Sequence, residues 1–248
     1  MLKDSIVNII AVVWFLLVWI GYAYFAKYKS KCGCTLSSVM NRQRLDWMKR
    51  MLERDTRVTD SVLVANLERN CSFLASTSIF VLAGLLTTLG IVNDLEATLK
   101  ALPFYIIADE HDSWIHLKIL LLILIYVYAF FTLSWSMRQY VFGSLMIGSA
   151  PEPDDANRNP FLKQQHAYVS SKVIDMAGHT YNYGLRAYSF SLAALSWFFS
   201  PWYFIVASTL VAFVLYLREF HSRPYKVLRD YQAHCDAEVE KHEAHNKS

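Results

Sequence analysis

Four polar side chains recur at helical spacing along one short stretch of the sequence: Asp175, His179, Asn182 and Arg186. This spacing places all four on one face of a helix, and we call them the polar stripe. An acid, an imidazole, an amide and a guanidinium on one face can bind an anionic or hydrogen-bonding solute, and the imidazole can relay a proton. The same groups can instead form an ion-pair network that locks a neighbouring helix in place.

The polar stripe must face protein or water, because charged side chains that enter a bilayer and face lipid are costly. Beside it runs a seam of small residues that permits close helix packing: Ala177, Gly184, Ala187, Ser191 and Ala194. We therefore expect the stripe to face the interior of a helix bundle. Its expected partners lie in two other charged segments: Arg138 in one, and Arg54, Asp55, Arg57 and Asp60 in the other.

A second group of residues offers metal-ligand chemistry. Asp112 and His116 are spaced to share a helical face, and His111 lies next to them. These groups could bind a divalent metal, although an acidic solvated loop is the simpler interpretation. Motifs for nucleotide binding, a catalytic serine or a zinc protease do not occur, and no nucleophile–base pair can be identified. No cofactor is indicated beyond bound lipid, and an enzyme is the third-ranked class.

Long apolar helices must position these residues. The chain is 54% hydrophobic and 18% charged, whereas an average soluble domain has about 25% charged residues. Five apolar runs approach the length of about 20 residues that crosses a bilayer as a helix. We predict an all-α, polytopic membrane bundle of about five spans, near 6–26, 71–92, 114–135, 182–199 and 202–217. The last two spans should be joined by a tight turn at Ser200-Pro201.

Two further segments complete the predicted single domain, 1–224. Residues 41–70 place apolar and charged side chains on opposite helical faces, which predicts one long amphipathic cytoplasmic helix between the first and second spans. Its charged face is a surface for a partner or for lipid head groups, or a solvated face alone. Residues 225–248 form a charged cytoplasmic tail. The second span has one face of small residues, so we expect it to pack inside the bundle.

The positive charges predict the orientation. The segments 27–69, 138–186 and 218–247 hold 21 of the 24 Lys and Arg residues, and the opposite side holds only Lys3, Lys100 and Lys118. Because basic residues collect on the cytoplasmic side, the N-terminus is predicted outside and the C-terminus in the cytoplasm. A net charge of +3 is too small to indicate nucleic acid as a partner.

Four segments together resemble domain-of-unknown-function family 599, a family of multi-pass membrane proteins of bacteria and plants. They are RLDWMKRMLERDTRVTD (44–60), FLASTSIFVLAGLLTTLG (73–90), YAFFTLSWSMRQY (128–140) and AGHTYNYGLRAYSFSLAALSWFFSP (177–201). The resemblance extends over roughly 44–223. It implies that the polar stripe and the RDTRVTD segment belong to one shared core, and it supplies no activity, cofactor or catalytic residue.

The expected function is non-catalytic. We expect an accessory or scaffold subunit of the bacterial inner membrane that associates with membrane lipids and with a larger membrane complex or a second copy of itself. The alternative is a small-solute or proton-coupled transporter that uses Asp175, His179, Asn182 and Arg186. A stripe closed by salt bridges favours the scaffold, whereas a stripe that lines a continuous polar cavity favours the transporter.

Overall fold

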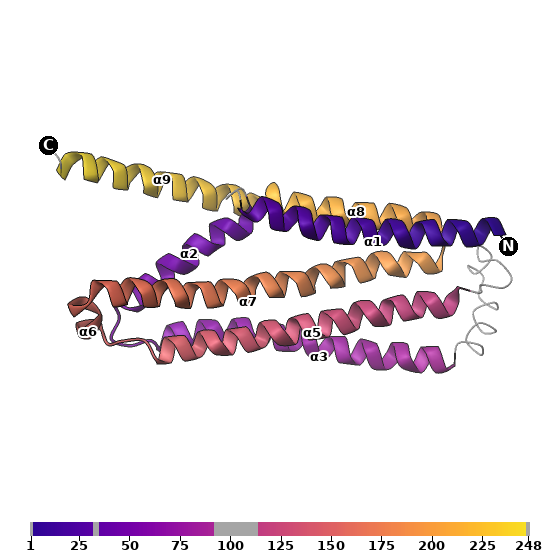
Figure 1. Cartoon of the computed structure of the whole chain (residues 1–248), viewed down its shortest axis with the longest axis horizontal. Coiled ribbons are helices and arrows are strands. Elements are labelled where there is room, and N and C mark those ends of the chain that lie inside the picture. Colours follow the sequence, from indigo (N-terminus) through magenta and orange to yellow (C-terminus); the bar gives the residue numbers. More distant parts are fainter. Residues whose placement is uncertain (1, 32–34, 92–113, 247–248) are drawn as a thin grey trace.

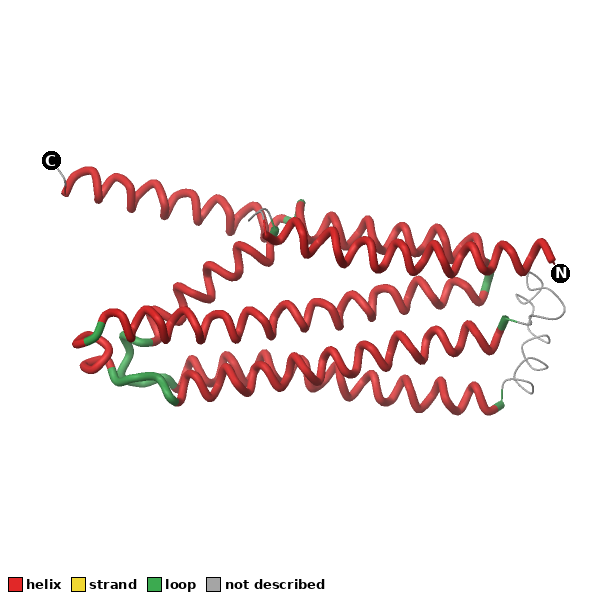
Figure 2. The backbone as a smooth tube through the Cα atoms, in the orientation of Figure 1, coloured by secondary structure: helices red, strands yellow, loops and turns green. Residues whose placement is uncertain are grey.

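The protein is helical throughout the part that the computed structural model describes, residues 2–31, 35–91 and 114–246. No strand occurs in these ranges (Figure 2). The helices follow in the order α1 (Leu2–Lys31), α2 (Leu36–Met51), α3 (Val58–Gly90), α5 (Ile115–Gly148), α6 (Pro153–Arg158), α7 (Pro160–Leu195), the short 3-10 helix η2 (Ser196–Phe198), α8 (Pro201–Phe220) and α9 (Arg223–Asn246).

The long helices lie roughly parallel to one another (Figure 1). Helix α5 packs between α3 and α7, α1 packs against α8, and α8 also contacts α7. Helix α2 crosses obliquely over α7, and α6 lies at the end of the bundle opposite to the N-terminus. Helix α9 continues from α8 and extends away from the other helices (Figure 1). The basic segments predicted to be cytoplasmic therefore gather at one end.

Four helical stretches are long and apolar enough to cross a membrane: Ser5–Lys29, Val58–Gly90, Ile115–Gly148 and Pro201–Glu238. They indicate a membrane protein, and each covers all or nearly all of one predicted span. The predicted span 182–199 is not among them. It falls in α7, where Asn182, Arg186 and several Ser and Tyr residues lower the mean hydropathy, and the α-helix ends at Leu195. The predicted turn at Ser200-Pro201 is confirmed, because Ser200 caps α8 and Pro201 is its first residue.

The prediction of a single amphipathic helix over 41–70 is wrong. Helix α2 begins one turn earlier, at a capping box in which the Thr35 hydroxyl accepts a hydrogen bond from the Ser38 amide. It ends at Met51, and the chain turns before α3 starts at Val58 and continues to Gly90. The second half of the predicted helix is thus the first part of the helix that contains the second span. The cause is a set of tertiary contacts around Asp60, described below.

Two hydrophobic cores divide the bundle along its length. One joins α1, α5, α7 and α8 around Phe15, Phe190, Trp197 and Phe204, all fully buried. Their rings pack edge-on or stacked, with centroids 4.9 to 5.7 Å apart. The other core joins α2, α3, α5 and α7, with members that include Met48, Met51, Leu52, Val64, Tyr140 and Ile174. Only α5 and α7 contribute to both cores.

Helices α5 and α7 approach closely along the predicted seam. Ala177, Gly184, Ala187, Ser191 and Ala194 are all buried. The Ser136 hydroxyl of α5 donates a hydrogen bond to the Ala177 carbonyl oxygen at 2.7 Å. Small residues thus let the two backbones meet, which is the packing that polar and small side chains favour in a bilayer.

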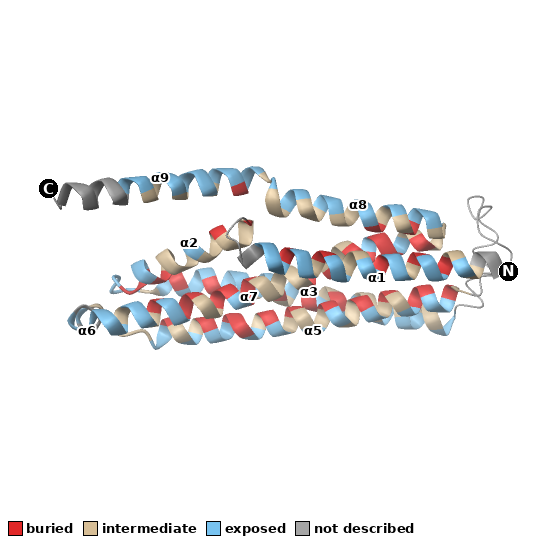
Figure 3. Ribbon diagram, turned by 45° about the horizontal axis from the view of Figure 1, so that its top comes forward, coloured by how far each residue is buried: buried red, intermediate tan, exposed pale blue. Residues whose placement is uncertain are grey.

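The expectation that the second span packs inside the bundle is wrong. Helix α3 packs mainly against α5, where Cys71 contacts Ser136, and it also meets Tyr188 of α7 through Ser78. It presents its other faces outward, so that only 11% of its apolar window is buried. Nothing lies within 4 Å of a side chain built at Gly84. Small residues permit close packing but do not require it, and Figure 3 shows α3 and α8 exposed over much of their length.

Gly184→Ala should destabilise the protein. A methyl group there would lie 2.6 Å from two carbons of the fully buried Leu133, so α5 or α7 must shift. Overpacking of this kind costs about 1–3 kcal/mol. Thermal and denaturant unfolding in detergent measure the change. Gly84→Ala is the matched control and should be neutral or stabilising by up to about 1 kcal/mol. Equal effects of the two substitutions would contradict the close packing of α5 against α7 at Gly184.

Candidate functional site

The N-terminal end of the polar stripe is an interhelical ion pair. Arg44 Nη1 of α2 donates a hydrogen bond to Asp175 Oδ1 of α7 at 2.6 Å. The Asp175 side chain is 7% exposed and the Arg44 side chain 18% exposed. His179 Nε2 lies 3.5 Å from the other Asp175 oxygen, and the Ser37 hydroxyl lies 3.3 Å from His179 Nδ1. Asp175 and His179 are therefore both tied to α2.

The electrostatics of this pair favour the charged carboxylate. Burial raises the pKa of Asp175, but the hydrogen bond from His179 and the charges of His179, Arg44 and Lys172 outweigh it and lower the pKa below its ordinary value. The absence of a side chain at Gly178 makes room for the arginine. A methyl group there would lie 2.8 Å from Arg44 Nη2, so the glycine lets the guanidinium pass against the α7 backbone.

The other end of the stripe pairs with α8 and not with α2. Arg186 Nη2 lies 3.6 Å from Glu219 Oε2, a longer separation than that of the Arg44–Asp175 pair. The Arg186 guanidinium also lies over the rings of Tyr22 and Tyr183, at 5.2 and 5.6 Å from their centroids. Such cation–π contacts stabilise a partly desolvated arginine. Arg186 is thus compensated by one acid and two aromatic faces.

Two cavities lie against this second end. One has a volume of about 480 Å³ and is lined from α1, α2, α5, α7 and α8. Its charged lining residues are Arg44, Arg186, Arg218 and Glu219. The other, of about 210 Å³, adds Lys27 and His179. Because Ser37, Asn182, Arg186 and Glu219 line both, the cavities are adjacent. We call them the stripe cavities.

The second charged segment forms a separate, structural cluster. Asp60 is fully buried, and its Oδ1 accepts hydrogen bonds from Trp47 Nε1 and Arg54 Nη1, both at 2.7 Å. Arg57 donates to the backbone carbonyl oxygens of Ala150 and Pro151, the former at 2.7 Å. These bonds pin the turn between α2 and α3 to the segment that follows α5. They explain why the chain leaves the helix at Met51 although no Gly or Pro occurs in the turn.

Two predicted site residues do not join either cluster. Asp55 is exposed in the turn between α2 and α3. Arg138 of α5 lies over the ring of Phe142, at 5.9 Å from its centroid, and does not pair with the polar stripe within the described residues. The structure therefore brings Asp175 and His179 to α2, Arg186 to α8, and Arg54 and Asp60 to each other.

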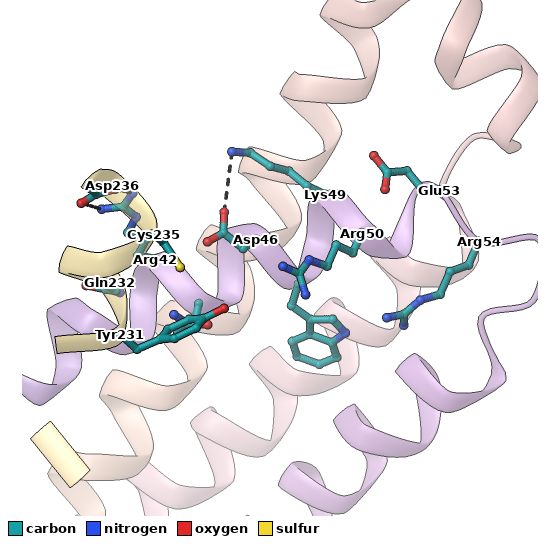
Figure 4. A pocket seen from close by; sticks show the side chains of 12 residues that line it. Arg42, Asp46, Lys49, Arg50, Glu53, Arg54, Tyr231, Gln232, Cys235 and Asp236 are labelled. Carbon is teal, nitrogen blue, oxygen red and sulfur yellow. Dashed lines mark hydrogen bonds and ion pairs between the residues drawn. The ribbon is translucent and has the colours of Figure 1, made fainter. Parts of the chain in front are cut away.

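A groove between α2 and α9 is the largest cavity that we describe, about 570 Å³. Figure 4 shows charged side chains of both signs along it, among them Arg42, Lys49 and Arg50. Arg42 Nη1 donates a hydrogen bond to Asp236 Oδ2 at 2.7 Å, and Lys49 lies 3.8 Å from Asp46. The Gln232 amide donates to the Val39 carbonyl oxygen at 3.0 Å. These contacts hold α9 beside α2, and the groove remains open on its outer side.

The metal hypothesis remains a prediction. His111 and Asp112 lie outside the described residues, and His116 is exposed at the start of α5. In the ranges that the structure describes, no three His, Cys, Asp or Glu side chains gather as metal ligands would.

Sequence reasoning missed the partners of the stripe. Arg44 was not singled out, although an acid that enters a membrane bundle needs a base nearby. Glu219 carried a clearer signal, because it is an acid directly after an apolar run and Arg186 required a counter-charge. Ser37 and Tyr22 gave no signal, since neither stands out by type or spacing.

The fold and the sites define a multi-helix membrane protein with no recognisable catalytic centre among the described residues. The model of a family described as "Protein of unknown function, DUF599" matches residues 10–224, and the chain belongs to this family. The resemblance noted from the sequence is thereby confirmed. No curated protein and no solved structure matches the chain.

Asp60→Ala should destabilise the protein, because it leaves Arg54 and Trp47 without their shared acceptor and removes a buried charge pair. Because the Arg54 side chain is 46% exposed and can be solvated, the loss is that of a buried hydrogen-bond acceptor, about 1–3 kcal/mol. Chemical unfolding in detergent measures the free energy, and Trp47 fluorescence reports the local change. Asp55→Ala removes the same charge from an exposed position and should change stability by less than about 0.5 kcal/mol. Similar losses for both variants would show that Asp60 is not the anchor of the turn.

Proposed function

We propose that this protein is a non-catalytic membrane scaffold, an accessory subunit that associates with a larger membrane complex or with lipid. The observation that carries the proposal is the pairing of Arg44 with Asp175. It uses one end of the polar stripe to hold α2 against α7. A buried acid already bound to arginine is poorly placed to act on a substrate, whereas it fixes the position of a helix.

The cytoplasmic end of the bundle supports the proposal as a binding surface. Helix α2, the turn around Asp60 and helix α9 are tied together by ion pairs and hydrogen bonds. The groove between α2 and α9 presents four basic side chains, Arg42, Lys49, Arg50 and Arg54, and three acidic ones, Asp46, Glu53 and Asp236. Basic side chains on an ordered surface favour an acidic partner or an anionic lipid surface.

The membrane part supports association as well. Helix α3 leaves Phe73, Ile79, Phe80 and Leu86 more than half exposed. In a bilayer this face contacts lipid or another membrane helix, because no other described helix packs on it. A helix that packs on one side only leaves room for a partner on the others.

We place the protein in the bacterial inner membrane with five spans. Four are the apolar stretches described above, and the fifth is the second half of α7, which packs between α5 and α8 and leaves Leu192 and Leu195 exposed to lipid. With the basic end in the cytoplasm, the N-terminus lies outside and α9 inside.

Purification in mild detergent at native abundance, with mass spectrometry and size analysis, tests the scaffold. We expect recovery in one stoichiometric assembly. Lys49→Glu with Arg50→Glu, in the groove, should release the partner. Lys226→Glu with Arg229→Glu makes the same charge change at exposed positions of α9 outside the groove, and this variant should keep the partner bound. Recovery of the unaltered protein alone, as a monomer or small homo-oligomer, would refute the accessory role.

A small-solute or proton-coupled transporter is the second candidate, and the stripe cavities favour it. Asn182 and Arg186 line both cavities, so the second end of the stripe borders open space and is not closed entirely by ion pairs. A polar cavity at a helix interface is the usual location of a transporter binding site.

Asp175→Asn separates the two candidates. For a scaffold, the substitution should lower the unfolding temperature by several degrees, because Arg44 loses its buried counter-charge. Asp236→Asn breaks the exposed pair with Arg42 and should leave the unfolding temperature nearly unchanged. For a transporter, uptake into proteoliposomes should fall while stability is retained. Unchanged stability together with lost uptake would therefore replace the scaffold with the transporter.

A further inference from the structure

The larger of the stripe cavities has a polar end and an apolar end. Arg44, Arg186, Arg218 and Glu219 form the polar end. Leu192 of α7 lies six residues beyond Arg186 along the helix, about 9 Å at 1.5 Å per residue. Leu215 lies one turn before Glu219 in α8, on the same side of the polar residues. Leu36 and Met40 of α2 also line the charged end, and Tyr188 and Ser189 lie between Arg186 and Leu192. The charged groups are therefore confined to one end, while the other end holds hydroxyl-bearing and apolar side chains.

The charges of the polar end favour an anion. Its lining holds three arginines and one glutamate. Arg44 is compensated by Asp175, and Glu219 lies 3.6 Å from Arg186. Arg218 is exposed and forms no ion pair with any described residue. Arg218 thus remains without an ion pair, next to Arg186, whose one carboxylate partner among the described residues is Glu219.

The apolar end favours a ligand with a hydrocarbon part. Leu192 is 66% exposed, and Leu215 is half-buried on α8. In a membrane these side chains contact acyl chains, so the cavity is continuous with the lipid. A free anion would use only the charged end, whereas an amphiphile uses both.

We propose that this cavity binds the phosphate-bearing head group of an anionic phospholipid from the cytoplasmic leaflet. The phosphate lies against Arg218 and Arg186, and the Asn182 amide is placed to bond the glycerol or ester oxygens. The acyl chains leave past Leu192 and Leu215. The orientation matches the leaflet, since the polar end is the one nearer to α2 and α9. This inference deepens the lipid-binding part of the proposed function by naming the ligand and its site.

Native mass spectrometry of the delipidated full-length protein tests it, by titration with phosphatidylglycerol and with phosphatidylcholine of the same acyl chains. Phosphatidylglycerol should bind at least about fivefold more tightly, since each arginine near an anionic lipid contributes about that factor. Arg218→Gln should weaken phosphatidylglycerol about fivefold and phosphatidylcholine by less, because the choline cation already offsets the charge of its phosphate. Arg218→Lys, which keeps the charge, should bind as the unaltered protein does.

Arg223→Gln is the matched control, because Arg223 is an exposed arginine at the start of α9 that does not line the cavity. It should keep the affinity within about twofold of the unaltered protein. Equal binding of the two lipids, or equal loss in the Arg218 and Arg223 variants, would overturn the proposal.

Titration of the same protein with inorganic phosphate is the third measurement. Saturable phosphate binding that Arg218→Gln abolishes, without any preference between the lipids, would assign the site to a soluble anion and overturn the lipid assignment. All these arms use the isolated protein, whereas the scaffold is tested by native assembly. Loss of the lipid preference would leave the stoichiometric assembly intact, so failure of one proposal is distinguishable from failure of the other.

Discussion

The arrangement of the bundle depends on the burial of α7, a helix too polar to face lipid. Its stripe carries an acid, an imidazole and a guanidinium toward the apolar part of the structure, and each needs a partner that lipid cannot supply. Helix α5 covers the seam of small residues, α2 supplies Arg44, and α8 supplies Glu219. Helix α1 covers the same helix through Phe15 and Trp19, which pack on Phe190. The positions of α1, α2, α5 and α8 therefore follow from the polar side chains of α7 that must be kept away from lipid.

Ion pairs in such a setting decide position more than they add stability. Desolvation of Asp175 and Arg44 opposes most of the gain from their attraction, so a well-packed apolar pair could be as stable. An apolar pair, however, would allow α2 to slide along α7, whereas a carboxylate and a guanidinium fix one register. Asp60 acts similarly at the turn, where two hydrogen bonds to one oxygen determine where α2 ends and α3 begins.

Much of this arrangement follows from local patterns in the sequence. Residue spacing predicts that Asp175 to Arg186 lie on one helical face beside a small-residue seam, and the apolar runs predict four of the spans that the structure contains. The partners could not be predicted, because Arg44 and Asp175 are 131 residues apart and spacing carries no information over that distance. The break after Met51 was missed for the same reason, since Asp60 ends the helix through contacts and not through a Gly or Pro. The outward position of α3 does not follow from its sequence, because small residues can face either a neighbouring helix or lipid.

The stripe cavities lie where the two parts of the bundle meet, and this position connects the two proposals. The pair formed by α1 and α8 contacts the remaining helices through the aromatic core and through Arg186, while α2 is attached to α7 by Asp175 and His179. The larger cavity is bordered by all four of these helices. An anionic head group there would therefore contact the α1–α8 pair and α2 at once, and would screen the repulsion between Arg186 and Arg218. A scaffold gains from such a ligand, because lipid from the surrounding leaflet would then fix the surface that the partner binds.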